Sequence, residues 1–214
     1  MTVILEKHRL AYVAVPKAAC TSIKSMFFEI ENGFTFNQFT SNGRKWHIHR
    51  IYPSVPFGKL PHNTLGDHSR LSLVRDPVRR LLSCYSNRIL HHRELSRAKA
   101  GKVLRQADLA PDPDIATFIG NLDAYRAAVR SIDHHARPMV DFLGTDPDYF
   151  TRVYRFEELG DFAEDVRRLT GTQVELGRKQ TGGPKIDPDT LSAKQVAFLK
   201  EYYAADYAAF GAYL

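Results

Sequence analysis

The chain has 214 residues, 43% of them hydrophobic, and its 30 Lys and Arg against 24 Asp and Glu give a net charge of +6. This length and apolar content suffice for one sizeable core, so we expect a single domain over residues 1–214. Two cysteines far apart in the sequence exclude a disulfide framework, and there is neither a signal peptide nor an apolar run of membrane-spanning length, so we expect a cytoplasmic protein.

The first predicted unit is a buried strand, a turn and an amphipathic helix. Residues 10–15 (Leu-Ala-Tyr-Val-Ala-Val) form an uninterrupted apolar run, which is typical of a strand in a parallel sheet. Pro16 ends this strand, and Thr21 and Ser22 start a helix that extends to about residue 31. The N–H groups at the helix start, the positive end of its dipole and the Lys17 ammonium are then expected to converge on one anion.

Residues 34–68 are rich in His, Asn, Gly and Pro and lack clear periodicity. We expect an irregular insert over the sheet edge, where substrate-binding loops commonly lie. Within it, His47 and His49 alternate, so on an extended segment their side chains share a face. A His-x-His pair could instead bind a metal, but no third ligand has convincing spacing.

A second strand, turn and helix follow over residues 71–93. The strand 71–74 leads to Arg75, and Pro77 takes the first position of a helix with an apolar stripe. Ser83 lies about two helical turns beyond Arg75, so both side chains can face the same ligand. The sequence therefore predicts a second anion-binding turn of the same design as the first.

The rest of the chain continues to alternate strands with helices. This alternation predicts an α/β fold with a central parallel sheet flanked by helices. The elements expected after a basic, poorly patterned stretch at 88–105 are a helix at 114–130, short strands at 140–143 and 152–156, a helix after the capping box Asp161-x-x-Glu164 that ends at Gly171, and a final helix capped by Ser192-x-x-Gln195.

The two anion-binding motifs resemble those of sulfotransferases that use 3′-phosphoadenosine 5′-phosphosulfate (PAPS). Pro-Lys-x-x-x-Thr-Ser follows the first strand, and Val-Arg-Asp-Pro-x-x-Arg-x-x-Ser-x-Tyr follows the second. The wording Val-Pro-Lys-Ala-Ala-Cys-Thr-Ser-Ile-Lys is closest to the carbohydrate branch, sulfotransferase family 2, which includes Golgi chondroitin and heparan sulfotransferases and bacterial relatives. The Golgi relatives carry an N-terminal membrane anchor that we do not find here, so we expect a soluble enzyme of the bacterial type.

The resemblance implies a nucleotide-kinase-like (P-loop-kinase-like) fold, PAPS as the donor, 3′-phosphoadenosine 5′-phosphate (PAP) as the product, and no metal. In that family the first loop holds the 5′-phosphosulfate, and the Arg and Ser of the second motif hold the 3′-phosphate. The same resemblance makes Lys17 catalytic, beside the oxygen that bridges sulfur and phosphorus. The donor-binding residues carried over are Lys17, Ala18, Ala19, Cys20, Thr21, Ser22, Arg75 and Ser83.

Sulfuryl transfer to an alcohol also needs a base, and histidine is the natural candidate because its pKa lies near neutral pH. In related sulfotransferases the catalytic His lies between the two phosphate motifs, roughly two dozen residues before the Arg. His47 and His49 lie 28 and 26 residues before Arg75. We favour His49 as the base, followed by His47 and then His68.

Three further features of the sequence carry weaker assignments. The pair Glu157–Glu158 resembles the acidic turn at a strand end found late in this family, or caps a helix. Arg178 and Lys179 lie where PAPS-dependent enzymes bring a basic loop over the cofactor. Cys20 and Cys84 are expected to be small packing residues and not nucleophiles.

The sequence therefore predicts an enzyme that moves a sulfuryl group from PAPS to a hydroxyl of a carbohydrate or glycolipid, in line and with a His general base. A nucleotide or small-molecule kinase of related fold stays open as an alternative, although Gly-x-x-x-x-Gly-Lys-Ser/Thr is absent. A non-enzymatic polyanion-binding protein is the third reading. We expect no nucleic-acid partner, because nucleic-acid-binding motifs are absent and a polyanionic donor explains the basic charge. Peripheral contact with a membrane stays open.

Overall fold

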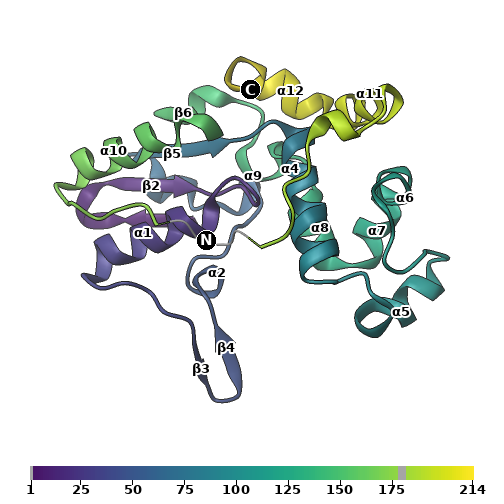
Figure 1. Cartoon of the computed structure of the whole chain (residues 1–214). Coiled ribbons are helices and arrows are strands. Elements are labelled where there is room, and N and C mark those ends of the chain that lie inside the picture. The colour runs from purple at the N-terminus through teal and green to yellow at the C-terminus, as the bar shows by residue number, and fades with distance from the viewer. Residues whose placement is uncertain (1, 178–181) are drawn as a thin grey trace. The chain divides into compact units, whose positions relative to one another are not determined.

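The computed structural model describes residues 2–177 and 182–214, and its elements fall into two units (Figure 1). The first, here called the sheet unit, comprises residues 2–75, 139–177 and 209–214. The second, the helical unit, comprises residues 76–138 and 182–208. The predicted basic loop residues Arg178 and Lys179 lie outside the described residues.

Within the described residues, four strands form the sheet of the sheet unit in the order β1-β2-β5-β6. The strands β2, β5 and β6 run parallel, as predicted, whereas β1 is antiparallel to β2 and makes the sheet mixed. The α/β fold class is therefore confirmed. The elements of this unit are β1 (Val3–Leu5), β2 (Leu10–Val13), α1 (Cys20–Asn32), β3 (Phe39–Ser41), β4 (Arg44–Trp46), α2 (Ile48–Ile51), α3 (His62–Leu65), β5 (Ser69–Val74), α9 (Val140–Leu143), β6 (Arg152–Arg155) and α10 (Leu159–Thr170).

An aromatic cluster holds α1 and α10 against the same face of the sheet. The ring of Tyr12, on β2, lies 5.7 Å from that of Phe27 on α1 and 5.6 Å from that of Phe162 on α10. The Phe162 ring also lies 5.1 Å from that of Tyr154 on β6. All four side chains are buried. Each such aromatic pair stabilises the fold by about 0.5–1.5 kcal/mol beyond the burial of its area.

The segment predicted as an irregular insert contains a β-hairpin. The strands β3 and β4 pair antiparallel, with Phe39 opposite Trp46. The turn between them is formed by Asn42 and Gly43, whose φ angles are 50° and 68°. Two consecutive left-handed residues form the tight turn that matches the twist of a hairpin, and Asn-Gly favours this turn. The Asn-Gly turn signal is therefore present in the sequence, but the strands are too short to show an alternation of apolar and polar residues.

Two other predictions for the sheet unit were wrong in detail. Residues Val140–Leu143, expected as a strand, form the helix α9, which ends at Gly144 with a φ angle of 73°. A short apolar run does not distinguish a strand from a buried helix. The helix α10 begins at Leu159, before the expected capping residue Asp161, but it ends at Gly171 as predicted.

The helical unit starts as the sequence predicts and then departs from a regular α-helix. Asp76 accepts a hydrogen bond from the backbone N–H of Arg79 at 2.9 Å, and Pro77 begins α4. The chain continues from α4 as a π-helix over Tyr85–His91. The basic stretch, which is poorly patterned in the sequence, contains a helix, and the helix expected at 114–130 is interrupted at Asn121. The helices are α4 (Pro77–Cys84), α5 (Arg97–Gln106), α6 (Ile115–Gly120), α7 (Leu122–Ala128), α8 (Arg130–Ala136), α11 (Ala193–Tyr202), which has the predicted capping box, and α12 (Ala204–Phe210), whose last residues belong to the sheet unit.

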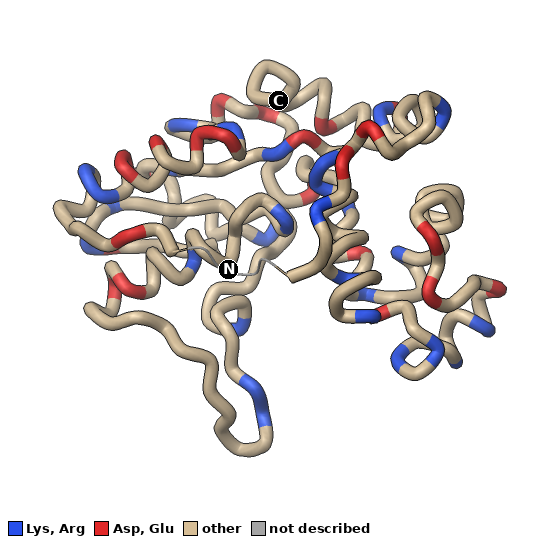
Figure 2. The backbone as a smooth tube through the Cα atoms, viewed as in Figure 1, with Lys and Arg blue, Asp and Glu red and all other residues tan. Residues whose placement is uncertain are grey.

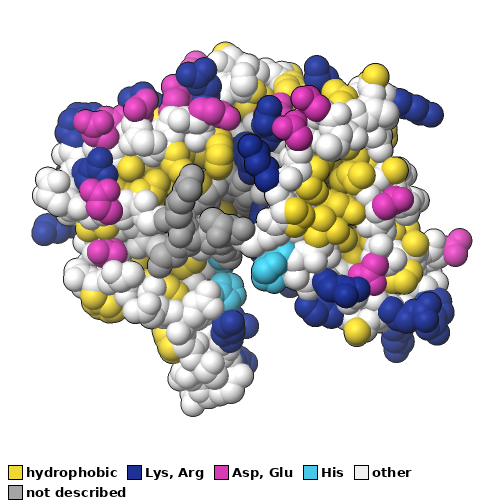
Figure 3. Space-filling view, in the orientation of Figure 1, with side chains coloured by type: hydrophobic (Ala, Val, Ile, Leu, Met, Phe, Trp, Pro, Cys, Tyr) yellow, Lys and Arg dark blue, Asp and Glu magenta, His cyan; other side chains and the backbone are white. Residues whose placement is uncertain are grey.

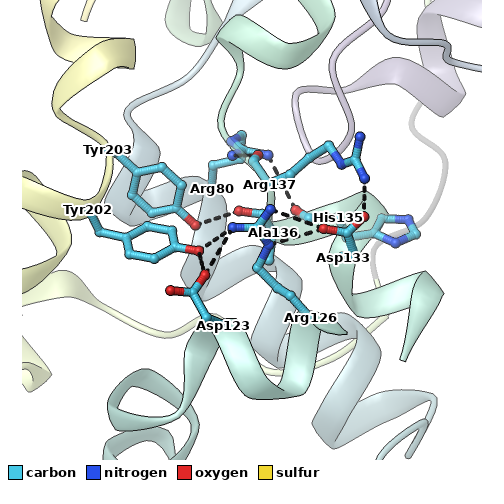
Figure 4. A network of polar contacts seen from close by, with 9 residues as sticks. All are labelled: Arg80, Asp123, Arg126, Asp133, His135, Ala136, Arg137, Tyr202 and Tyr203. Carbon is cyan, nitrogen blue, oxygen red and sulfur yellow. Dashed lines mark hydrogen bonds and ion pairs between the residues drawn. The ribbon is translucent and has the colours of Figure 1, made fainter. Parts of the chain in front are cut away.

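The carboxyl end of α8 is held by two buried side chains from other helices (Figure 4). Arg80, fully buried on α4, donates hydrogen bonds to the carbonyl oxygens of His135, at 3.3 Å, and Arg137. The Tyr203 hydroxyl, just after α11, donates to the carbonyl oxygen of Ala136 at 2.6 Å. The last carbonyl groups of a helix find no N–H donor within that helix. The Arg80 and Tyr203 side chains supply donors to carbonyl oxygens that would otherwise be buried without partners.

We expect Tyr203→Phe to lower the free energy of unfolding by about 1–3 kcal/mol, because it leaves the buried Ala136 carbonyl without its donor. Urea denaturation followed by circular dichroism measures this difference. As a control, Tyr213→Phe alters a partly exposed tyrosine and is expected to change the free energy by no more than about 0.5 kcal/mol. Equal effects of the two substitutions would contradict the role given to the Tyr203 hydroxyl.

Candidate functional site

The loop between β2 and α1 is a tight turn with two left-handed residues. Lys17 has a φ angle of 68° and Ala19 one of 52°, and neither is glycine. Left-handed backbone at a non-glycine residue costs on the order of 1–3 kcal/mol and is concentrated at functional sites. The helix α1 begins directly after this turn, at Cys20, with the positive end of its dipole toward the loop. Turns of this kind with a helix start are suited to bind an anion.

The second motif reaches the first loop through Arg75, which follows β5. Because β2 and β5 are parallel neighbours, with Val13 opposite Ser72, their carboxyl ends meet at one edge of the sheet. There Arg75 Nη1 donates a hydrogen bond to the carbonyl oxygen of Lys17 at 3.2 Å. The Arg75 guanidinium carbon also lies 4.4 Å from the centre of the Phe156 ring. Two motifs that are 58 residues apart in the sequence are therefore in direct contact.

Among the candidate bases, His49 contacts the first loop's helix. Its Nε2 lies 2.8 Å from the Oγ1 of Thr21, at the start of α1. His47 and His49 do not lie together on an extended segment, because His49 is inside α2 and His47 is the residue before it. The two rings are still close, with centres 5.9 Å apart. His49 is partly exposed, so it can be reached from solvent.

The other two histidines between the motifs are engaged in packing. His68 is buried, with its Nε2 3.3 Å from a carboxylate oxygen of Glu6. His62 Nε2 donates to the carbonyl oxygen of Phe57, and its Nδ1 lies 3.0 Å from the Tyr149 hydroxyl. These contacts favour His49 over His68 as the candidate base.

Lys24 is a site residue to which the sequence analysis gave no role. It is fully buried on α1, and its Nζ donates to the Ser54 hydroxyl at 2.8 Å and lies 3.4 Å from His49 Nδ1. Burial lowers the pKa of Lys24 to about 8, an effect that the nearby Cys20 thiol partly opposes. The signal that could have identified it is its position, one helical turn after Thr21 and so on the same face.

The remaining candidate residues divide between the two units. In the sheet unit, Ala18, Cys20 and Ser22 are buried at the loop and the helix start. Glu158 accepts a hydrogen bond from the backbone N–H of Arg155 at 2.7 Å, and this bond lowers the pKa of the Glu158 carboxyl. The contact agrees with the second of the two roles considered for Glu157–Glu158, in which the pair caps a helix. In the helical unit, Ser83 is partly exposed on α4.

Cys20 and Cys84 are both buried and not in a disulfide, as expected of packing residues. No group of three or more metal-ligating side chains occurs among the described residues. In the same part of the chain, no helix is both long and apolar enough to cross a membrane.

Comparison with known protein families gives a match over nearly the whole chain. The family model described as "Sulfotransferase family" matches residues 1–213, which is nearly the entire chain. No curated protein and no solved structure was found to match the chain.

Proposed function

The chain belongs to the sulfotransferase family, and we propose that it transfers a sulfuryl group from PAPS to a hydroxyl group of a carbohydrate or glycolipid. The observation that carries this proposal is the hydrogen bond from Arg75 to the carbonyl oxygen of Lys17. This hydrogen bond connects the two motifs with which the family binds the 5′-phosphosulfate and the 3′-phosphate of the donor. A cytoplasmic enzyme of the bacterial type is part of the same proposal.

The donor lies with its 5′-phosphosulfate on the first loop. Loop and helix N–H groups from Ala19 to Ser22 bind the phosphate and sulfate oxygens, and Lys17 adds a positive charge. Arg75 binds the 3′-phosphate with Ser83. Since Ser83 belongs to the helical unit, its assignment rests on its spacing from Arg75 in the sequence.

The reaction is an in-line displacement at sulfur. The acceptor oxygen forms a bond to sulfur while the bond between sulfur and the bridging phosphate oxygen breaks, and PAP leaves with the electron pair. His49 Nε2 takes the proton of the acceptor hydroxyl. The Lys17 ammonium stabilises the negative charge that develops on the departing oxygen. His47 is the alternative base, because its ring lies beside that of His49.

The hairpin before these histidines supports a carbohydrate acceptor. Phe39 and Trp46 stack with their ring centres 6.0 Å apart and an angle of 6° between the rings, and Phe39 is 50% exposed. The face of an exposed aromatic ring suits the apolar face of a sugar. Figure 3 shows hydrophobic side chains at the surface beside the base of the hairpin.

The same hairpin carries positive charge. Arg44 and Lys45 are exposed on β4, which appears as a blue stretch in Figure 2. Two cations beside an aromatic stack favour an acidic glycan over a neutral one. The strand β4 leads directly into His47, so an acceptor bound on the hairpin lies close in the chain to the proposed base.

We expect Arg75→Ala to weaken PAP binding by about 10- to 150-fold, because a lost charge-assisted hydrogen bond costs about 1.5–3 kcal/mol. Ser83→Ala should weaken it less. Calorimetry with PAP measures both, and Arg79→Ala, an exposed arginine nearby in sequence, is the control. If the wild type binds adenosine 5′-phosphosulfate, which has no 3′-phosphate, as tightly as it binds PAPS, the assignment of the 3′-phosphate site is wrong.

The same calorimetry separates the alternative functions. A preference for ATP with Mg²⁺ would indicate a kinase. The lack of any saturable nucleotide site would indicate a polyanion-binding protein.

For the base, His49→Ala should lower kcat by roughly 10²–10⁴-fold and leave PAP affinity nearly unchanged, because this histidine contacts the acceptor and not the nucleotide. Transfer of labelled sulfate from PAPS to desulfated glycosaminoglycans measures the rate. His47→Ala should lower it less. If His49→Ala keeps full activity while His47→Ala loses it, the role moves to His47.

For the acceptor, we expect Phe39→Ala and Trp46→Ala to raise the KM for the glycan several-fold without changing the dissociation constant of PAP. Phe198→Ala is the matched control, since Phe198 is 42% exposed on α11. If the KM for the glycan is the same in the hairpin variants as in this control, the hairpin does not bind the acceptor.

A further inference from the structure

We propose that Lys24 is a positioning residue that decides which ring nitrogen of His49 carries the proton, so that Nε2 becomes a proton acceptor only after Lys24 has lost its own proton. The importance of this control for turnover rests on the proposed function. The proton positions themselves do not, because they concern Lys24, His49 and Thr21 in the protein without substrate.

The contacts form a chain of four polar side chains. The Thr21 hydroxyl lies at His49 Nε2, and the Lys24 amine lies at His49 Nδ1 on the other side of the ring. Lys24 also donates to the hydroxyl of Ser54. The amine is fully buried, so its exchange of protons depends on these neighbours and not on a shell of water. The ring of His49 is therefore held between a group that can only donate when charged and a hydroxyl that can do either.

While Lys24 is an ammonium ion, it has no lone pair and can only donate. His49 Nδ1 must then be the acceptor, and the single hydrogen of the neutral ring lies on Nε2. That hydrogen points to the Oγ1 of Thr21, which accepts it. In this state the nitrogen on the Thr21 side has no lone pair to take a proton from an acceptor hydroxyl.

Once Lys24 has passed a proton through its neighbours to solvent, its amine has a lone pair and keeps two hydrogens. One hydrogen continues to bind Ser54, and the lone pair is able to accept a hydrogen from His49 Nδ1, which the ammonium ion could not do. With the ring hydrogen on Nδ1, the lone pair of the neutral ring is on Nε2. It accepts from Thr21 at rest and takes the proton of the acceptor hydroxyl as the new bond to sulfur forms.

The change occurs in an accessible pH range because burial lowers the pKa of Lys24 to about 8. Further titratable groups among the described residues also face the pair. The Cys20 thiol, one turn earlier on α1, opposes the effect of burial on Lys24, and the His47 ring lies 5.9 Å from that of His49. Because deprotonation of Lys24 frees Nε2, the fraction of competent His49 rises with pH through this value.

The test is nuclear magnetic resonance of the ¹⁵N-labelled full-length protein, in which two-bond nitrogen–hydrogen correlations identify the protonated ring nitrogen. Over a titration from about pH 6.5 to about pH 9.5, the His49 proton in the wild type should move from Nε2 to Nδ1. Lys24→Met should abolish this transition, and Lys24→Arg, which stays charged, should keep the proton on Nε2. The His49→Ala spectrum assigns the signals.

Ser54→Ala is the matched control, because it removes the other partner of Lys24 without touching His49, and it should keep the transition. If a Lys24 variant does not fold, the wild-type titration still decides, since one tautomer at both ends of it overturns the inference. An unchanged transition in Lys24→Met overturns it as well.

The sulfate-transfer rate separates this inference from the proposed function. In the wild type, the rate should rise with pH together with the movement of the proton, and in Lys24→Met this rise should be lost. Movement of the proton in a protein without transfer activity would contradict the proposed function alone. Transfer activity with a fixed tautomer would contradict the role of Lys24 alone.

Discussion

The parallel pairing of β2 with β5 is the contact on which the candidate site depends. It sets the carboxyl ends of two strands side by side, so that the turn after each strand begins at the same edge of the sheet. The backbone hydrogen bonds of this pair also determine the register, and with it the distance at which Arg75 reaches the carbonyl oxygen of Lys17. A shift of the register by one residue would reverse the faces of all side chains on β5 and remove this contact.

Two buried cations illustrate different ways in which the protein accommodates charge away from water. Arg80, in the helical unit, has backbone carbonyl oxygens as acceptors, and its fixed planar donors satisfy the end of a helix. Lys24, in the sheet unit, has a hydroxyl and an imidazole as neighbours, and burial lowers its pKa. Carbonyl oxygens do not titrate, whereas an imidazole does. The first arrangement is therefore suited to stability, and the second to moving a proton.

The sequence predicted the two strand-turn-helix units well because their signals are local. Pro16 and Pro77 mark the turns, and the Asp76 side chain caps the following helix as its residue type favours. The hairpin and α9 were missed for the opposite reason, since each element is short and its pattern of three or four residues fits more than one structure. The base was predicted only as an order of preference among histidines, and no pattern in the sequence indicated which of them contacts α1.

The sequence by itself determined the residue types at the site and the family: a lysine turn, an arginine after a second strand, and histidines between them. Only the tertiary structure decided that Thr21 and Lys24 hold the two sides of the His49 ring. The reason is physical. Turns and caps depend on neighbours within about four residues, whereas contacts across 25 to 28 residues depend on how α2 packs against α1.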